Sequence, residues 1–129
     1  MVNKRPEAIW HPSFLKGSTL EDTGDIRGAI RAYRRAAEDG DASSQNNLAN
    51  LLDDYSKPAR PEEAIYWYKR AIRAGHSTAA YNLAIHYRNN AQPRWHLHWL
   101  LVAAQMGDPD APKEARTLKR QLERTKRER

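Results

Sequence analysis

Two stretches of this chain repeat one another at a constant offset of 35 residues, and this repetition constrains the fold more than any other feature. Residues 33–49 read YRRAAEDGDASSQNNLA, and residues 68–84 read YKRAIRAGHSTAAYNLA. A third and weaker copy, LLVAAQMGDPDAPKEA, occupies residues 100–115. Such repetition is typical of stacked units that share one core, because a single small unit cannot bury its own apolar face.

The periodicity within each copy is that of α-helices. Apolar residues recur every three or four positions, and no stretch alternates as a strand would. Glycine ends each run at a position where it commonly closes a helix, at Gly40, Gly75 and Gly107. Helix starts are marked by Pro61, Pro93 and the pair Asp108-Pro109. We therefore expect seven helices, over residues 13–22, 26–38, 43–55, 61–73, 77–89, 93–106 and 109–126.

Each copy also places a large side chain three residues before an alanine. The pairs are Tyr33 with Ala36, Tyr68 with Ala71, and Leu100 with Ala103. A large side chain opposite a small one lets two helices approach closely while the groove between them is filled. We expect the helices on either side of each glycine to pack in this way. The last helix should cap the stack with an inner face of Ala115, Leu118 and Leu122.

The segment AIYWYKRAIRAGHSTAAYNLA resembles the Sel-one-like repeat, a branch of the tetratricopeptide-like helical repeats. The matching positions are Ala64, Trp67, Tyr68, Ala71, Gly75, Ala79 and Leu83. The resemblance implies an all-α protein, a right-handed α-solenoid of about three helix-turn-helix repeats with a C-terminal capping helix. The repeat domain would span residues 13–118, after an N-terminal extension over 1–12 and before the basic end of the capping helix over 119–129.

The positive charge of the chain is concentrated at one end. The net charge is +6, and residues 113–129 contribute +5 through eight Lys or Arg and three Glu. The body is nearly neutral, and we see no second basic patch in it. The chain has no cysteine, no apolar run long enough to cross a bilayer, and no secretory signal in its first residues. These features favour a cytoplasmic protein without a membrane partner.

The sequence offers little to a metal or a catalytic site. His96 and His98 stand one residue apart, but on a helix they point in different directions and cannot chelate one ion. No phosphate-binding loop, nucleophile elbow or zinc-protease motif is present. We therefore expect no metal, no cofactor and no enzymatic activity.

The resemblance implies instead a concave groove lined by the first helix of each repeat, which binds a protein or peptide. Carried over to this chain, it selects Asn46, Asn50 and Asp53 in one repeat and Tyr81, Ile85 and Arg88 in the next. Each set has i, i+4, i+7 spacing and so lies on one helical face. Tyrosine and arginine are favoured where binding energy concentrates.

Two alternatives remain open. A protein of this build and length could be an immunity protein that neutralises a cognate bacterial toxin. The tail could also bind nucleic acid through Lys119, Arg120, Arg124, Lys126 and Arg127. The tail has no interleaved aromatic residues for base stacking, so nucleic acid is the less favoured partner. We expect a monomer or a weak homo-oligomer.

Overall fold

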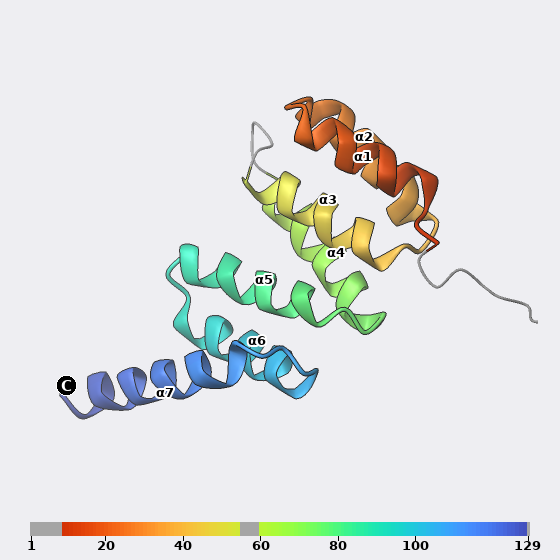
Figure 1. The fold of residues 1–129 in the computed structure, drawn as a ribbon. Coiled ribbons are helices and arrows are strands. Elements are labelled where there is room, and N and C mark those ends of the chain that lie inside the picture. Colours follow the sequence, from red (N-terminus) through yellow and green to blue (C-terminus); the bar gives the residue numbers. More distant parts are fainter. Residues whose placement is uncertain (1–8, 55–59, 129) are drawn as a thin grey trace, which may run out of the picture.

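The computed structural model describes residues 9–54 and 60–128, and within these two ranges it is all-helical, without a strand (Figure 1). The helices are α1 (Pro12–Asp22), α2 (Ile26–Glu38), α3 (Ala42–Asp54), α4 (Pro61–Arg73), α5 (Ser77–Asn89), α6 (Pro93–Gln105) and α7 (Ala111–Arg127). The all-α prediction is therefore confirmed. None of the helices in the described ranges is long and apolar enough to span a membrane.

The expected helix bounds agree with these to within one residue, except at the start of α7. We expected α7 to begin at residue 109, and it begins at Ala111. The Asp108 side chain accepts hydrogen bonds from the backbone N–H groups of Asp110 (2.9 Å) and Ala111 (3.1 Å). Pro109 and Asp110 belong to this turn, and the helix begins after them. The expected last residue of α3, residue 55, lies outside the described ranges.

The joints after α2, α4 and α6 have the same geometry. Their glycines all have positive φ, at +96° for Gly40, +91° for Gly75 and +100° for Gly107. The residue after each glycine donates its backbone N–H to an alanine carbonyl five residues earlier, namely Asp41 to Ala36 (3.1 Å), His76 to Ala71 (3.0 Å) and Asp108 to Ala103 (2.9 Å). These are Schellman closures, in which a left-handed residue satisfies the last carbonyls of a helix.

The residue that closes one helix also caps the next. Asp41 accepts from the N–H of Ser44 (2.9 Å) and His76 from that of Ala79 (3.3 Å), as Asp108 does from Ala111. One residue thus satisfies backbone groups of two helices, which fixes a short joint. The repetition seen in the sequence is in this way a repetition of local structure.

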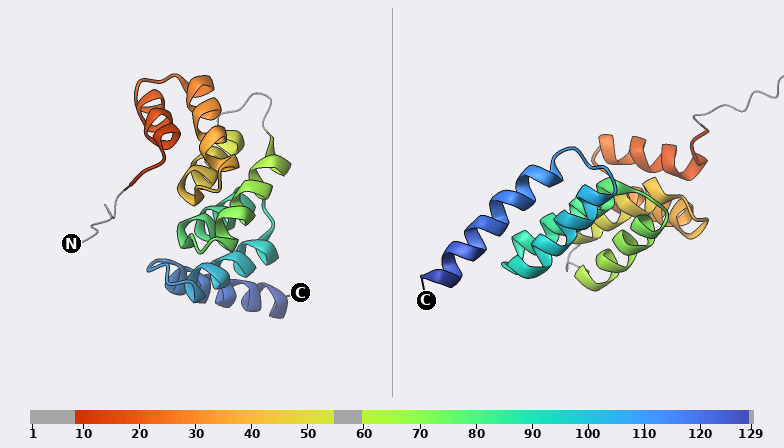
Figure 2. Two further views of the ribbon diagram at one scale, coloured as in Figure 1. Left: turned by 90° about the vertical axis from the view of Figure 1, so that its right-hand side faces the viewer. Right: turned by 90° about the horizontal axis from the view of Figure 1, so that it is seen from below.

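The helices follow one another in chain order from one end of the molecule to the other (Figures 1 and 2). The most extensive contacts lie within the pairs α1–α2, α3–α4 and α5–α6, while α7 packs on α6 and α3 also touches α5. The helices flanking Gly75, α4 and α5, contact each other less than either contacts its own pair partner. The glycine joints therefore connect successive pairs rather than the two members of a pair. We expected the closest packing between the helices that flank each glycine, but the most extensive contacts are those within the pairs.

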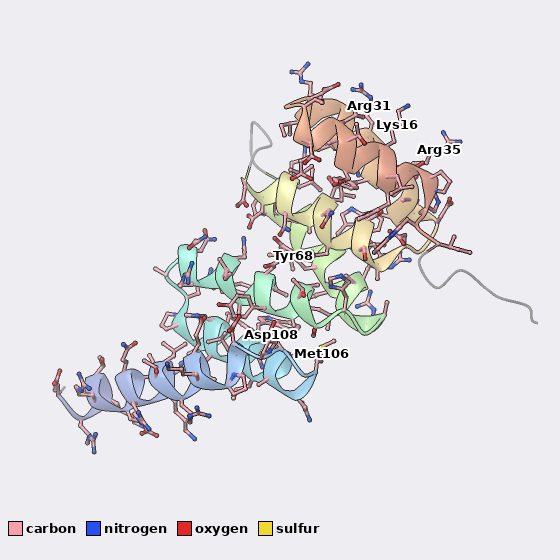
Figure 3. The ribbon with its side chains drawn as sticks, in the orientation of Figure 1. Lys16, Arg31, Arg35, Tyr68, Met106 and Asp108 are labelled. Carbon is pink, nitrogen blue, oxygen red and sulfur yellow. The ribbon has the colours of Figure 1, made fainter. Side chains whose placement is uncertain are left out.

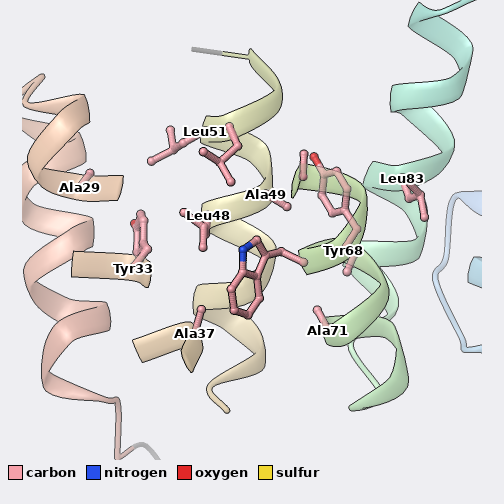
Figure 4. Close-up of a cluster of buried hydrophobic side chains, with 13 residues drawn as sticks. Ala29, Tyr33, Ala37, Leu48, Ala49, Leu51, Tyr68, Ala71 and Leu83 are labelled. Atoms are coloured by element: carbon pink, nitrogen blue, oxygen red, sulfur yellow. The ribbon is translucent and has the colours of Figure 1, made fainter. Parts of the chain in front are cut away.

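The core consists of two connected clusters of buried side chains. The first joins α2 to α5 (Figure 4), the second joins α5 to α7, and Ile72 and Trp99 pack against both. The large side chains of the three copies are buried as predicted, with exposed fractions of 1–2% for Tyr33, Tyr68 and Leu100. Of the predicted inner face of α7, Ala115 is buried and Leu118 packs against the second cluster.

At the N-terminal end of the stack, α1 is fitted closely to α2. A Cβ atom at Gly17 would come within 2.7 Å of the Tyr33 ring, so only glycine allows this approach. The end of the expected N-terminal extension also packs here, because Trp10 stacks on Phe14 with ring centroids 5.1 Å apart. Residues 1–8 of that extension lie outside the described ranges.

Candidate functional site

An open pocket of about 310 Å³ runs along α1, α3 and α5, and we call it the polar groove. Its lining residues are Glu21, Asn50, Leu51, Asp53, Asp54, Tyr68, Asn82, Ile85, His86 and Asn89. Apart from Tyr68, which projects from α4 (Figure 4), they all come from the first helices of the three pairs. The first helices therefore line one hollow together.

Tyrosines of the repeated sequence hold side chains of the groove in place. The Tyr68 hydroxyl donates to Asn50 Oδ1 at 2.5 Å, and the Tyr33 hydroxyl donates to Glu21 Oε1 at 2.8 Å. Burial, reinforced by the nearby charges of Asp53 and Asp54, raises the pKa of Tyr68. Burial and the bond to Glu21 raise the pKa of Tyr33 to about 12. Both phenols are therefore hydrogen-bond donors at neutral pH.

A histidine and a carboxylate connect α5 to α3 at the wall of the groove. His86 Nδ1 lies 2.9 Å and 3.0 Å from the two carboxylate oxygens of Asp53. An ionised carboxylate only accepts hydrogen bonds, so Nδ1 carries the proton. His86 is 5% exposed, and the Asp53 side chain is 16% exposed. The pair fixes the spacing of the two helices and orients the Asp53 carboxylate.

Carboxylates outnumber basic groups among the described lining residues, so the groove should have a negative potential. Glu21, Asp53 and Asp54 lie on its walls, and no lysine or arginine is among the described lining residues. Asp54 is exposed, but its partial desolvation raises its pKa, and the charge of Asp53 raises it further. Concave walls concentrate such a field, so the groove should attract cationic groups.

Three of the six residues predicted to form the binding groove line this pocket: Asn50, Asp53 and Ile85. Asn46 lies instead in the contact between α3 and α5, where it is 5% exposed and its Oδ1 accepts from Asn82 at 3.0 Å. Arg88 is exposed and lies outside the pocket lining.

Tyr81 points toward α7, where its hydroxyl donates to the Glu114 carboxylate. This bond, together with burial, raises the pKa of Tyr81 to about 12. Tyr81 lies on α5, one of the helices that line the groove, as predicted. Its side chain does not reach the groove and instead bonds to the last helix, α7.

Sequence reasoning did not select the other lining residues, which are Glu21, Leu51, Asp54, Tyr68, Asn82, His86 and Asn89. Tyr68 was assigned only to the core, although its hydroxyl reaches the groove. No local motif points to His86, because its partner, Asp53, lies 33 residues away. The separation of 33 residues is close to the repeat offset of 35, which was a sign that His86 and Asp53 could meet on successive first helices.

The two histidines of α6 have different surroundings, since His98 lies among aromatic rings and His96 lies beside α7. His98 packs edge-on against Trp95 and Trp99, with ring centroids 5.5 Å and 4.8 Å apart. Burial lowers the pKa of His96, which favours its neutral form. In the described part of the chain, no three His, Asp or Glu residues are grouped closely enough to hold a metal ion.

The predicted basic tail is a solvent-exposed stretch of α7. Lys119, Arg120, Arg124, Lys126 and Arg127 are all exposed. None of the five forms an ion pair with another described residue.

Part of the chain is similar to part of a known protein. No family model matches the chain. The chain is 37% identical over 86 residues to F-box protein At1g70590 of Arabidopsis thaliana, an alignment that covers 57% of this chain and 24% of that protein. The chain thus corresponds to about a quarter of the length of this relative.

Proposed function

We propose that this chain is a non-catalytic interaction module that binds a segment of a partner protein in the polar groove. The observation that carries the proposal is the groove itself, an open hollow with three carboxylates and three amide side chains, most of which are held by hydrogen bonds. A preorganised polar surface of this kind binds with little loss of side-chain freedom.

In this proposal the helix pairs form a right-handed solenoid of Sel-one-like repeats. Support comes from the joints at Gly40, Gly75 and Gly107, which close one helix and cap the next with the same bonds. The contact between α3 and α5 also brings first helices of successive pairs together, as stacking of equivalent units requires.

The absence of chemistry is also part of the proposal. A histidine hydrogen-bonded to an aspartate can activate a nucleophile, so the pair of His86 and Asp53 deserves that comparison. The described lining of the groove contains no serine, threonine, cysteine or lysine that the histidine could activate. The pair instead fits a structural role, because it joins two helices and is nearly buried.

The chemistry of the groove indicates a basic partner segment. A lysine or arginine side chain could donate to the carboxylates of Asp53 and Asp54 and to neighbouring amide oxygens. Ile85 offers apolar contact for the stem of such a side chain. The partial similarity to an F-box protein agrees with a role in interaction with other proteins.

Selection of peptides from a random library on the purified chain tests this proposal. We expect the selected peptides to include a class rich in lysine and arginine, and the following tests use that class. These peptides should bind the double variant Asp54→Lys with Asn89→Lys at least about 10-fold more weakly than wild type, because a groove carboxylate is replaced and two cations are introduced. Asp54 and Asn89 are exposed, so the fold should tolerate both changes.

The matched control is Glu62→Lys with Thr78→Lys, which changes the net charge by the same amount at exposed positions outside the groove. The control should bind the selected peptides within about twofold of wild type, since isolated exposed charges contribute little. Equal weakening in both double variants, or a library that yields no binding peptide, would refute the proposal.

A further inference from the structure

A second hollow, of about 420 Å³, lies between α1 and α2 and has the opposite charge. Its walls carry Lys16 from α1 and Arg31 and Arg35 from α2, and we call it the basic groove. It shares no lining residue with the polar groove. The expectation that the body of the chain carries no second basic patch was therefore wrong, because folding brings these three cations together.

The three cations are available to a ligand. Lys16, Arg31 and Arg35 are exposed, and none of them forms an ion pair within the described ranges. The adjacent Arg34 differs, since it is bound to the Glu63 carboxylate of α4. Figure 3 shows Lys16, Arg31 and Arg35 on the side of α1 and α2 that is turned away from α3.

The one carboxylate among the described lining residues already accepts a hydrogen bond. Asp25 Oδ1 accepts the backbone N–H of Gly28 at 2.9 Å, which caps the start of α2. The floor between the charges is partly apolar, with Leu20 and the buried Ala32. The hollow therefore combines a surplus of positive charge with a small apolar contact area.

We propose that the basic groove is a docking site for an acidic helical segment of a partner protein. Arg31 and Arg35 stand four residues apart on one face of α2, and Arg27 continues that face one turn earlier. Glutamates spaced four residues apart on a partner helix have the same separation and can each accept an arginine fork. An apolar residue between them would meet Leu20.

Nucleic acid fits this surface less well. No aromatic side chain lines the described walls, so unpaired bases find nothing to stack on. A duplex binds through many phosphate contacts spread over an extended surface, whereas this hollow supplies three cations around a partly apolar floor.

Fluorescence anisotropy with a labelled, alanine-based helical peptide tests the proposal. The probe carries three glutamates spaced four residues apart, and a matched peptide has glutamine at the same positions. Wild type should bind the glutamate peptide, and the triple variant Lys16→Glu, Arg31→Glu, Arg35→Glu should bind it at least about 10-fold more weakly. Affinity for the glutamine peptide should already be weak and should change little.

The control for net charge reverses three residues of the tail, Arg120→Glu, Arg124→Glu and Lys126→Glu, which are also exposed. It should reduce binding of the glutamate peptide by less than about threefold, because charges beyond a Debye length are screened. The neutral variant Lys16→Ala, Arg31→Gln, Arg35→Gln should also lose binding. If circular dichroism shows that the charge-reversal variant does not fold, the neutral variant is used to test the proposal in its place.

Three outcomes would overturn the proposal. The first is that wild type does not bind the glutamate peptide. The second is that the groove and tail variants lose affinity equally, which would mean that net charge alone drives binding. The third is that a duplex DNA of random sequence binds through Lys16, Arg31 and Arg35 while the glutamate peptide does not, which would assign the groove to nucleic acid.

Discussion

Replacing Ala91 by glycine should make the protein more stable. Ala91 lies in the joint between α5 and α6 with φ at +55°, the one non-glycine residue with positive φ in the described ranges. Its N–H donates to the Arg88 carbonyl at 3.1 Å, and the next N–H, of Gln92, donates to the Tyr87 carbonyl at 3.0 Å. These are the bonds that the other joints make with glycine at this position, so alanine is held in a conformation that suits glycine.

The size of the effect follows from two opposing terms. A left-handed conformation costs a residue with a Cβ atom roughly 1–2 kcal/mol. Glycine makes the unfolded chain more flexible, which opposes the gain by about 0.4–1 kcal/mol. Ala91 is exposed, so its methyl group contributes little packing. We therefore expect Ala91→Gly to raise the free energy of unfolding by about 0.5–1 kcal/mol, or about 2–5 °C in Tm.

Urea unfolding followed by far-ultraviolet circular dichroism measures this change. The reciprocal variant, Gly75→Ala, should be less stable by about 0.5–1 kcal/mol, from the same two terms. A Cβ atom at Gly75 would meet no atom within 4 Å, so this loss reports backbone strain alone. A further control, Ala74→Gly, changes a residue with φ at −85° and should be destabilising. If Ala91→Gly is destabilised as Ala74→Gly is, the reasoning about the joints is wrong.

Three further predictions concern the packing of α1 on α2, a hydrogen bond of the polar groove, and the helix cap at His76. Gly17→Ala should lower the free energy of unfolding by about 1–3 kcal/mol, because the new methyl group collides with the Tyr33 ring; an unchanged urea midpoint would contradict this. Tyr68→Phe should cost about 1 kcal/mol in the same assay, since Asn50 loses its donor, and a neutral result would show that the bond contributes nothing. Burial lowers the pKa of His76 below its usual 6.5, so the unfolded chain binds more protons and stability should fall as the pH drops from about 7 toward 5. In His76→Asn, the amide oxygen can replace Nδ1 as the acceptor of the Ala79 N–H and does not titrate in that range. This variant should show a smaller fall, and equal slopes would rule out this role for His76.

The local structure could be predicted from the sequence because its signals are themselves local. Pro61 and Pro93 begin helices, and the glycines at 40, 75 and 107 end them, at the expected places. The predicted helix bounds were wrong where a side chain bonds to the backbone of a neighbouring turn. Asp108 delays the start of α7 through bonds that depend on the turn it forms.

The candidate site was only partly predictable from the sequence. A helical face gives the positions of Asn50, Asp53 and Ile85, which do line the polar groove. It does not give the rotation of α5, which turns Tyr81 toward Glu114. Charge counted along the chain does not reveal the basic groove, whose cations come from two helices. The four-residue spacing of Arg27, Arg31 and Arg35 was the signal that could have found its α2 wall.

Chemical-shift mapping by nuclear magnetic resonance tests the central claim most directly. The ¹⁵N-labelled chain is titrated with a lysine- or arginine-rich peptide selected on it, and the shifted backbone and side-chain amides are located. Binding in the polar groove predicts the largest shifts at Asn50, Asn82, Ile85 and Asn89, on α3 and α5. Shifts confined to residues 119–128 of α7, with α3 and α5 unchanged, would contradict the account.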